Sequence, residues 1–342
     1  MPVAIIRVVP IADNEHLYMS QSTGVAAPVF DPFSYGIELP LQTEVNAHGF
    51  LMRVITNSPD VIQTAEETWS GFPLLFTDHL LEFRVAVSHN EQAKRPSDMT
   101  TRAQGHLILT MSDEEDFAIG DLEKGFASFW VSPASARDHQ FLCNYHLNNV
   151  MYLMLWHAHM TMVHAACVTR NGRGVLLCGP SGAGKSCLAF ACALRGWTFV
   201  TDDGVSLARR STERLVVGTP RGMHFRPTAV SVLPELEGHL VPIQPWGKLS
   251  FKPATNAFPE FRRSVHANID AVVFLNRDTG GPARLVPMSA EEAFSRLDRE
   301  LPLMEQIEDQ RLSLRRLVKA RSFELRYSDL YDAVNTLGSL VS

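Results

Sequence analysis

The sequence predicts an α/β protein with two domains, and two observations support this prediction. The chain has 342 residues, a length that favours two domains over one. Beyond about residue 138, short apolar runs alternate with helical patterns, as in a sheet that carries helices on its faces. We therefore expect a smaller α/β domain at residues 1–137 and a larger domain, a mixed sheet with flanking helices, at residues 138–342.

The overall composition is that of an ordinary globular protein with a full core. Hydrophobic residues make up 45% of the chain and charged residues 20%. The net charge of −6 gives no sign of nucleic acid or an anionic membrane as a main partner. The five cysteines form no CxxC pair, which fits reduced thiols and a cytoplasmic location. Neither a signal peptide nor a membrane span is expected, because the most apolar window, residues 141–160, contains several Asn and His side chains.

The N-terminal region has a mixed pattern without a catalytic motif. Residues 61–72 fit a short helix, and residues 81–88, 106–112 and 126–132 have the composition of strands. The acidic run at residues 113–116 is interpreted as a solvated turn, with a recognition patch for a basic partner as the alternative. No residue pattern defines the role of this region, and substrate recognition is one role it could have.

The C-terminal region opens with a long predicted helix at residues 138–160. Strands are expected at residues 162–168 and 174–179. A helix then starts at Lys185 and ends before Gly196, a residue suited to a C-cap. The further expected elements are a strand at 197–200, a hairpin around 211–212, a strand at 271–277, and helices at 289–301 and 329–337 with Ser289 and Ser328 as N-caps.

The stretch GPSGAGKS, from Gly179 to Ser186, matches the Walker A or P-loop pattern G-x-x-x-x-G-K-[ST] in full. Glycines let successive backbone N–H groups face phosphate oxygens, and the following helix directs its positive end at them. Lys185 is expected to reach the β- and γ-phosphates of ATP, and Ser186 to bind Mg²⁺. The residues expected to contact the nucleotide are Gly179, Ser181, Gly182, Ala183, Gly184, Lys185, Ser186 and Cys187.

Two adjacent carboxylates, Asp202 and Asp203, follow the predicted strand at residues 197–200. Neighbouring side chains project differently, so one carboxylate could bind the metal while the other acts on an attacking hydroxyl. The alternative is an Asx-type turn before Gly204.

His164 lies in the apolar run MVHAACV, where the pattern alone favours a hydrogen-bonded core histidine. A metal cluster with His157 and His159 is disfavoured, because two residues that are two positions apart on a helix face different sides. The role of His164 therefore stays open at the level of pattern.

The run VHAACVTRNGRGVLLCGPSGAGKSCLAFACALRGWTFVTDD resembles the catalytic core of the HPr kinase/phosphorylase family and its HPr-kinase-like relatives. The histidine that opens the run, the loop form G-x-S-G-x-G-K-S and the paired aspartates after an RG-aromatic step all agree with the family spacing. The family phosphorylates a serine hydroxyl, in its founding members on a small phosphocarrier protein. The resemblance implies that Asp202 is the general base, that His164 is its polar neighbour, and that Asp203 and Ser186 hold the metal.

The chain also departs from the family pattern. Founding members carry a further signature after the aspartates, with a glutamate that helps to bind metal, whereas residues 215–234 contain no Asp or Glu. Arg221 and Gly222 are what remains of that signature. The departure indicates a divergent relative, puts reverse phosphorolysis in doubt, and keeps open a second substrate class, the ribosomal peptides such as lasso precursors.

Several cations after the paired aspartates could neutralise charge on a transferring phosphoryl group, although scattered surface charge is the alternative for each. Lys248 is the preferred candidate, because it follows a turn and opens a strand-like run. The full set is Arg221, Arg226, Lys248, Lys252, Arg262 and Arg263.

Together these observations predict an ATP- and Mg²⁺-dependent kinase that acts on a serine of a protein or peptide. A kinase for a small hydroxylated molecule and a non-catalytic nucleotide-binding sensor or scaffold are the alternatives. The expected partner is a protein or peptide substrate, with no role for nucleic acid or membrane, and self-association is left open.

Overall fold

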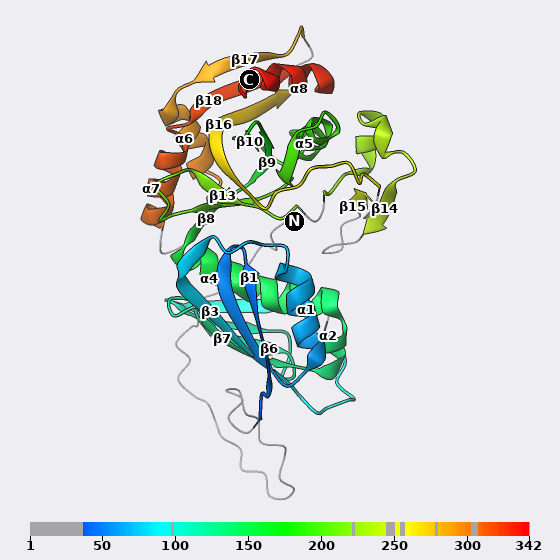
Figure 1. Cartoon of the computed structure of the whole chain (residues 1–342), viewed down its shortest axis with the longest axis vertical. Helices are drawn as coiled ribbons and strands as arrows, with labels where there is room; N and C mark the ends of the chain where they lie inside the picture. Colours follow the sequence, from blue (N-terminus) through cyan, green and yellow to red (C-terminus); the bar gives the residue numbers. More distant parts are fainter. Residues whose placement is uncertain are drawn as a thin grey trace, which may run out of the picture. The chain divides into compact units, whose positions relative to one another are not determined.

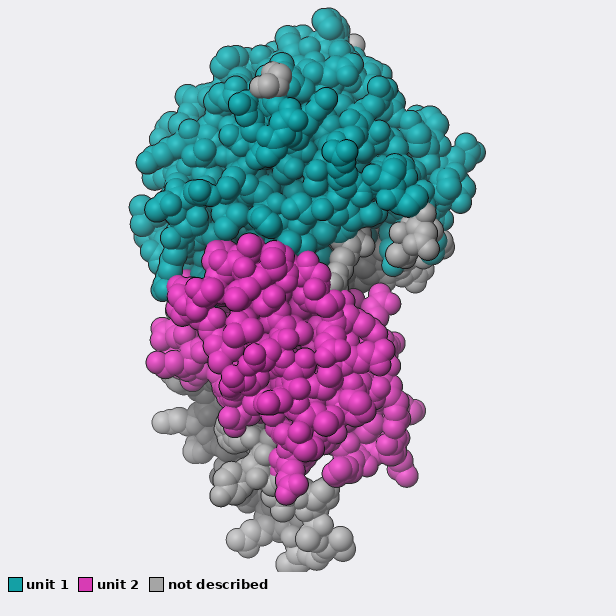
Figure 2. All heavy atoms as spheres, in the orientation of Figure 1, with its two compact units in different colours: residues 1–4, 159–342 teal, residues 5–158 magenta. Residues whose placement is uncertain are grey.

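The computed structural model describes residues 37–96, 99–220, 223–243, 250–253, 257–277, 280–301 and 307–341. The chain divides into two compact units between Ala158 and His159, drawn in different colours in Figure 2. We call them the N-terminal unit and the C-terminal unit. The division lies after the long helical stretch, not before it at residues 137 and 138 as expected from the sequence.

The N-terminal unit contains a seven-stranded sheet in the order β1-β2-β3-β7-β6-β5-β4. The pairs β2–β3 and β3–β7 are parallel, and the other pairs are antiparallel. Three of the strands, β3, β5 and β7, match predicted strands. The bounds are β1 Leu41–Ala47, β2 Phe50–Thr56, β3 Phe76–Val87, β4 Thr100–Gln104, β5 Leu107–Met111, β6 Phe117–Asp121 and β7 Phe126–Val131.

The helices of the N-terminal unit include the long stretch that was predicted to open the second domain. It forms as α3 (His139–Phe141), a π-helix η1 (Leu142–Leu147) and α4 (Asn148–Ala158). The segment η1 contacts both α1 (Pro59–Trp69) and α2 (Pro133–Arg137), so its apolar residues belong to the core of this unit. This packing explains why the division between the units comes after α4.

The acidic run before β6 is only partly a solvated turn. Asp113 and Glu114 are exposed as predicted, but the Asp116 side chain is fully buried. Its Oδ1 accepts the backbone N–H of Ser132 at 3.3 Å and lies 3.6 Å from Nε2 of the equally buried His146. Burial raises the pKa of Asp116 and lowers the pKa of His146 to about 3, so neither side chain favours its charged form there.

The buried imidazole of His146 predicts a pH dependence of stability. Its pKa rises from about 3 in the folded chain to the ordinary value near 6.5 on unfolding, so the unfolded state binds more protons between these values. Stability should therefore fall as the pH drops below 6.5, by up to about 1.4 kcal/mol per pH unit. His146→Leu should flatten this dependence of the free energy of unfolding on pH, as measured by urea unfolding at several pH values. His106→Gln, at a more exposed site, should leave the pH dependence unchanged. Parallel slopes for His146→Leu and the unsubstituted chain would contradict the prediction.

The C-terminal unit contains a mixed nine-stranded sheet, as predicted from the alternation of strands and helices. Its main path is β11-β9-β10-β16-β13-β12-β8, and β18 pairs with both β16 and β17. The pairs β10–β16 and β16–β18 are parallel. The bounds are β8 Met160–Val163, β9 Ala165–Arg170, β10 Arg173–Cys178, β11 Thr198–Thr201, β12 Val205–Ala208, β13 Leu215–Val217, β16 His266–Arg277, β17 Arg284–Met288 and β18 Arg321–Tyr327.

Helices cover both faces of this sheet, because its central strands are apolar on both sides (Figure 1). In β10, Leu177 joins a cluster with α5 (Lys185–Leu194) and α8 (Leu330–Gly338). The adjacent Leu176 joins a second cluster with α6 (Ala290–Asp298) and α7 (Ile307–Leu317). Two short 3-10 helices, η2 (Pro227–Ser231) and η3 (Pro234–Leu236), and a separate hairpin of β14 (Leu240–Ile243) and β15 (Ser250–Pro253) complete the unit.

The N-cap predicted for α6 is confirmed, whereas the N-cap of α8 lies one residue after the predicted one. Ser289 caps α6, because its side chain accepts the N–H of Glu292. The cap of α8 is Asp329 and not Ser328, since the Asp329 carboxylate accepts the N–H of Asp332 at 2.8 Å. The five cysteines are free, and among the described residues no helix is long and apolar enough to cross a membrane.

Candidate functional site

The glycine-rich loop joins the carboxyl end of β10 to the start of α5. Gly182 and Gly184 have φ values of 91° and 97°, in the left-handed region that favours glycine. A Cβ on Gly184 would also lie 2.9 Å from the hydroxyl of Tyr327. Gly184 caps α5 without a side chain, so the first N–H groups of this helix keep no capping partner. The loop therefore presents free backbone donors at the positive end of α5.

Lys185 extends under this loop and is 6% exposed. Its Nζ donates to the carbonyl oxygens of Gly179 at 2.6 Å and Pro180 at 3.3 Å. Burial lowers the pKa of Lys185, while the nearby charges of Asp203 and Glu300 act in the opposite direction. The ammonium group is thus held inside the curve of the loop, at the place where the sequence pattern puts a phosphate.

Asp202 and Asp203 follow β11, as predicted, but their environments differ. Asp202 is 2% exposed, its Oδ2 accepts the backbone N–H of His224 at 2.8 Å, and burial raises its pKa. The side chain of Asp203 is 27% exposed and pairs with Nε2 of His164 at 3.1 Å. Burial opposes ionisation of Asp203, but the hydrogen bond with His164 lowers its pKa below the ordinary value.

His164 lies in a break between two strands, not inside one strand as predicted. β8 ends at Val163 and pairs with β12, whereas β9 begins at Ala165 and pairs with β10 and β11. The residue between them leaves the strand geometry, and its imidazole reaches Asp203. The sequence resemblance placed His164 beside Asp202, so the observed partner is the second aspartate and not the first.

Glu300 is a site residue that the sequence did not indicate. Its Oε2 lies 3.8 Å from Nδ1 of His164, so the imidazole stands between two carboxylates. The charge of Glu300 also acts on Lys185 and on the buried thiol of Cys178, which places it near the glycine-rich loop. Glu300 follows α6 and lies outside every motif of the sequence, so no local pattern could have identified it.

The cationic side chains suggested by the sequence have different surroundings in the structure. Arg226 reaches the loop, because its Nη2 donates to the Ser181 hydroxyl at 3.1 Å. Lys252 is close enough to lower the pKa of His224. Arg263 donates to the carbonyl oxygens of Phe258 and Phe261 and so supports a local turn. Arg221 and the preferred candidate Lys248 lie outside the described residues.

Residues 156–226 match a family model described as HPr Serine kinase C-terminal domain. HPr kinase/phosphorylases of Bacillus cytotoxicus, Bacillus cereus and Bacillus anthracis are each 27% identical over 142 residues, which is 41% of this chain and 44% of theirs. The chain thus spans less than half the length of these relatives. The solved structure of the Hpr(Ser) kinase/phosphatase from Coxiella burnetii aligns with 53% of this chain and 93% of its own, at 15% identity and a TM-score of 0.27.

The family match concerns one segment of the C-terminal unit and shows what that segment is similar to. The matched residues, 156–226, include β8 to β13, α5 and the glycine-rich loop. The similarity to HPr-kinase-like proteins therefore rests on the segment that carries Asp202, Asp203 and His164. The resemblance inferred from the sequence is confirmed.

The crowding at Gly184 gives a test of the loop geometry. Gly184→Ala and Gly196→Ala both introduce a Cβ at a positive φ, but nothing lies within 4 Å of a Cβ on Gly196. Each should lose about 1 kcal/mol or more of stability through backbone strain, and Gly184→Ala should lose more because of the contact with Tyr327. Urea unfolding measures the two losses, and Tyr327→Phe should recover part of the excess in the Gly184→Ala background. Equal losses at the two glycines would show that the close contact is absent.

Proposed function

We propose that the chain is an ATP- and Mg²⁺-dependent kinase that transfers the γ-phosphoryl group to a serine hydroxyl of a protein or peptide. One observation carries the proposal: the glycine-rich loop with its buried Lys185 shares a site with two carboxylates, one of which is paired with an imidazole. The names of the curated relatives support a kinase reaction. Those names give HPr as the acceptor of the relatives, whereas the acceptor proposed for this chain is either a phosphocarrier-like protein or a ribosomal peptide.

The residues of the glycine-rich loop are suited to binding a nucleoside triphosphate. The uncapped N–H groups of α5, the ammonium of Lys185 and the guanidinium of Arg226 all supply donors or positive charge around one loop. Lys185 now donates to loop carbonyls and would exchange these bonds for phosphate oxygens. Ser186 and Asp203 are the residues that would hold Mg²⁺, which supplies charge neutralisation on the phosphate when it is bound.

The two aspartates have different roles in this proposal, because their environments differ. A carboxylate with a raised pKa is a better base for a serine hydroxyl, and this description fits Asp202. A carboxylate with a lowered pKa stays ionised and suits a metal, and this description fits Asp203. Since Asp202 is 2% exposed, the segment that carries His224 must open for a serine to reach it.

Glu300 completes the site as a positioning residue in this proposal. It holds Nδ1 of His164 from the side opposite Asp203, so the imidazole keeps Nε2 directed at Asp203. The founding family members have a glutamate in the segment that here, at residues 215–234, contains none. Glu300, from a distant part of the chain, thus supplies a carboxylate near His164 and Asp203 in this proposal.

The proposed reaction is tested by following label from ATP to a candidate protein or peptide. Asp202→Asn should lower transfer by about a hundredfold or more, because the amide cannot accept the serine proton. Its ATP affinity should stay within about threefold of the original, whereas Lys185→Ala should lose binding as well as transfer. Asp78→Asn, at an exposed site in the N-terminal unit, serves as the control. ATP binding without transfer to any acceptor would instead support a nucleotide sensor.

Removal of the Glu300 charge tests the positioning role. Glu300→Gln should lower kcat by about tenfold with little change in the KM for ATP, since the residue orients His164 and does not touch the nucleotide. Glu300→Asp should recover part of the loss. Glu291→Gln, on the exposed side of α6, is the matched control and should behave like the unsubstituted chain. A raised KM with unchanged kcat would place Glu300 in nucleotide binding and contradict the positioning role.

A further inference from the structure

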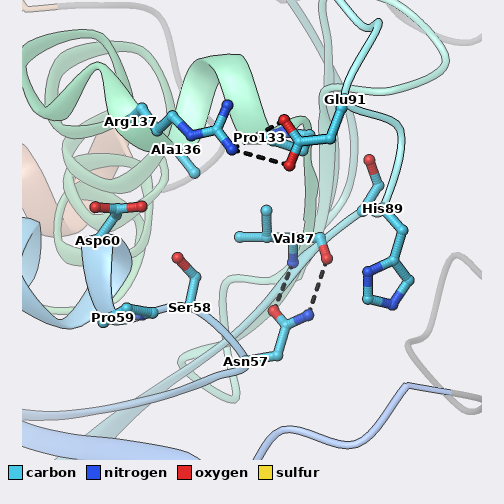
Figure 3. Close-up of a pocket in the computed structure, with 11 residues that line it drawn as sticks. Asn57, Ser58, Pro59, Asp60, Val87, His89, Glu91, Pro133, Ala136 and Arg137 are labelled. Atoms are coloured by element: carbon cyan, nitrogen blue, oxygen red, sulfur yellow. Dashed lines mark hydrogen bonds and ion pairs between the residues drawn. The ribbon is translucent and has the colours of Figure 1, made fainter.

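A pocket of about 190 Å³ lies in the N-terminal unit, apart from the glycine-rich loop (Figure 3). It is built where three neighbouring parallel strands, β2, β3 and β7, reach their carboxyl ends. Asn57 and Ser58 follow β2, His89 follows β3, and α2 begins just after β7. Ligands of α/β proteins bind preferentially outside the carboxyl ends of parallel strands, so the position of the pocket is that of a binding site.

A buried hydroxyl in this pocket has no partner in the described part of the chain. Ser58 is 7% exposed and stands at the N-cap of α1, yet its side chain makes no capping hydrogen bond. Figure 3 shows the hydroxyl directed into the pocket. The side chain of the neighbouring Asn57 is already hydrogen-bonded to the backbone of Val87. Its Nδ2 donates to the Val87 carbonyl at 2.9 Å, and its Oδ1 accepts the Val87 N–H at 2.8 Å. Ser58 therefore offers a free polar group at the positive end of an eleven-residue helix.

Charged side chains of both signs surround the same space. Arg137 Nη2 donates to both carboxylate oxygens of Glu91 at 2.9 Å, but the two side chains are 60% and 65% exposed. An ion pair this exposed contributes little to stability, so a ligand could separate it at little cost. Asp60, which lines the other side of the pocket, adds a second carboxylate and lies 3.8 Å from His139.

This charge pattern excludes simple ions as good ligands. A bare anion would face the carboxylates of Asp60 and Glu91, and a bare cation would face Arg137 and the positive end of α1. A molecule with both charges satisfies these groups: its carboxylate would bind Arg137, the Ser58 hydroxyl and the N–H groups that follow Pro59 at the start of α1, and its ammonium would bind Glu91 and Asp60. The volume is that of about six water molecules, which suits a small zwitterion.

We propose that this pocket binds a free α-amino acid, with its carboxylate at Ser58 and Arg137 and its ammonium at Glu91 and Asp60. The N-terminal unit is then a small-molecule-binding unit. This assignment is independent of the reaction at the glycine-rich loop, because every lining residue belongs to the N-terminal unit.

The test is a calorimetric titration of the full chain with each proteinogenic amino acid in turn. At least one should bind with a stoichiometry of one and a Kd of about 1 mM or tighter. The N-acetyl derivative of that amino acid, which lacks the ammonium, and its amide, which lacks the carboxylate, should each bind about tenfold or more weakly. Equal binding of either derivative would overturn the zwitterion assignment, as would the failure of every amino acid to bind.

Variants locate the binding in the pocket. Arg137→Ala and Ser58→Ala should each weaken the affinity by about tenfold or more. Arg137 is exposed, so its loss leaves the core intact even if Ser58→Ala unfolds. Arg53→Ala removes a comparable exposed ion pair on β2 and should bind normally, as should Lys185→Ala in the other unit. Unchanged affinity in Arg137→Ala would place the amino acid elsewhere and overturn the proposal.

Discussion

The turn from β10 into α5 is the constraint on which the rest of the C-terminal unit depends. β10 runs parallel to the central strand β16, and the pairing between them ends at Cys178, opposite Phe274. It then enters a helix within a few residues, which is possible only because Gly182 and Gly184 adopt positive φ. The short turn leaves the first N–H groups of α5 uncapped. A local backbone requirement thus creates the positive site around which the charged side chains gather.

The break at His164 is a second consequence of the same sheet. β9 must pair with β10 and β11, whereas β8 pairs with β12, so one continuous strand cannot serve both sets of neighbours. The chain changes partners at His164, and the freed imidazole meets Asp203 at the end of β11. The two aspartates therefore differ in environment: Asp202 is buried and accepts the N–H of His224, while Asp203 is partly exposed and paired with His164. Opposite pKa shifts on adjacent carboxylates arise from this division of partners.

The sequence predicted the features that short-range signals determine. The glycine pattern located the loop and the start of α5, and Ser289 was recognised as an N-cap. The features it missed depend on contacts between distant residues. Asp116 looked like part of a solvated acidic turn, but the chain folds over it and sets it beside His146. The long helix was assigned to the wrong unit, because its sequence shows an apolar face but not which sheet that face covers.

Glu300 shows that a carboxylate can lie near His164 even though the segment at residues 215–234 contains none. The signature segment of the relatives carries no acidic residue here, and a reading of that segment alone would call the centre incomplete. Yet α6 packs its apolar face on the sheet surface that contains Leu176 and Cys178, and the end of this helix brings Glu300 to His164 and within electrostatic reach of Lys185. Charge at a site is set by the position of side chains in space and not by their order in the chain. A carboxylate from another element can therefore meet the same electrostatic need.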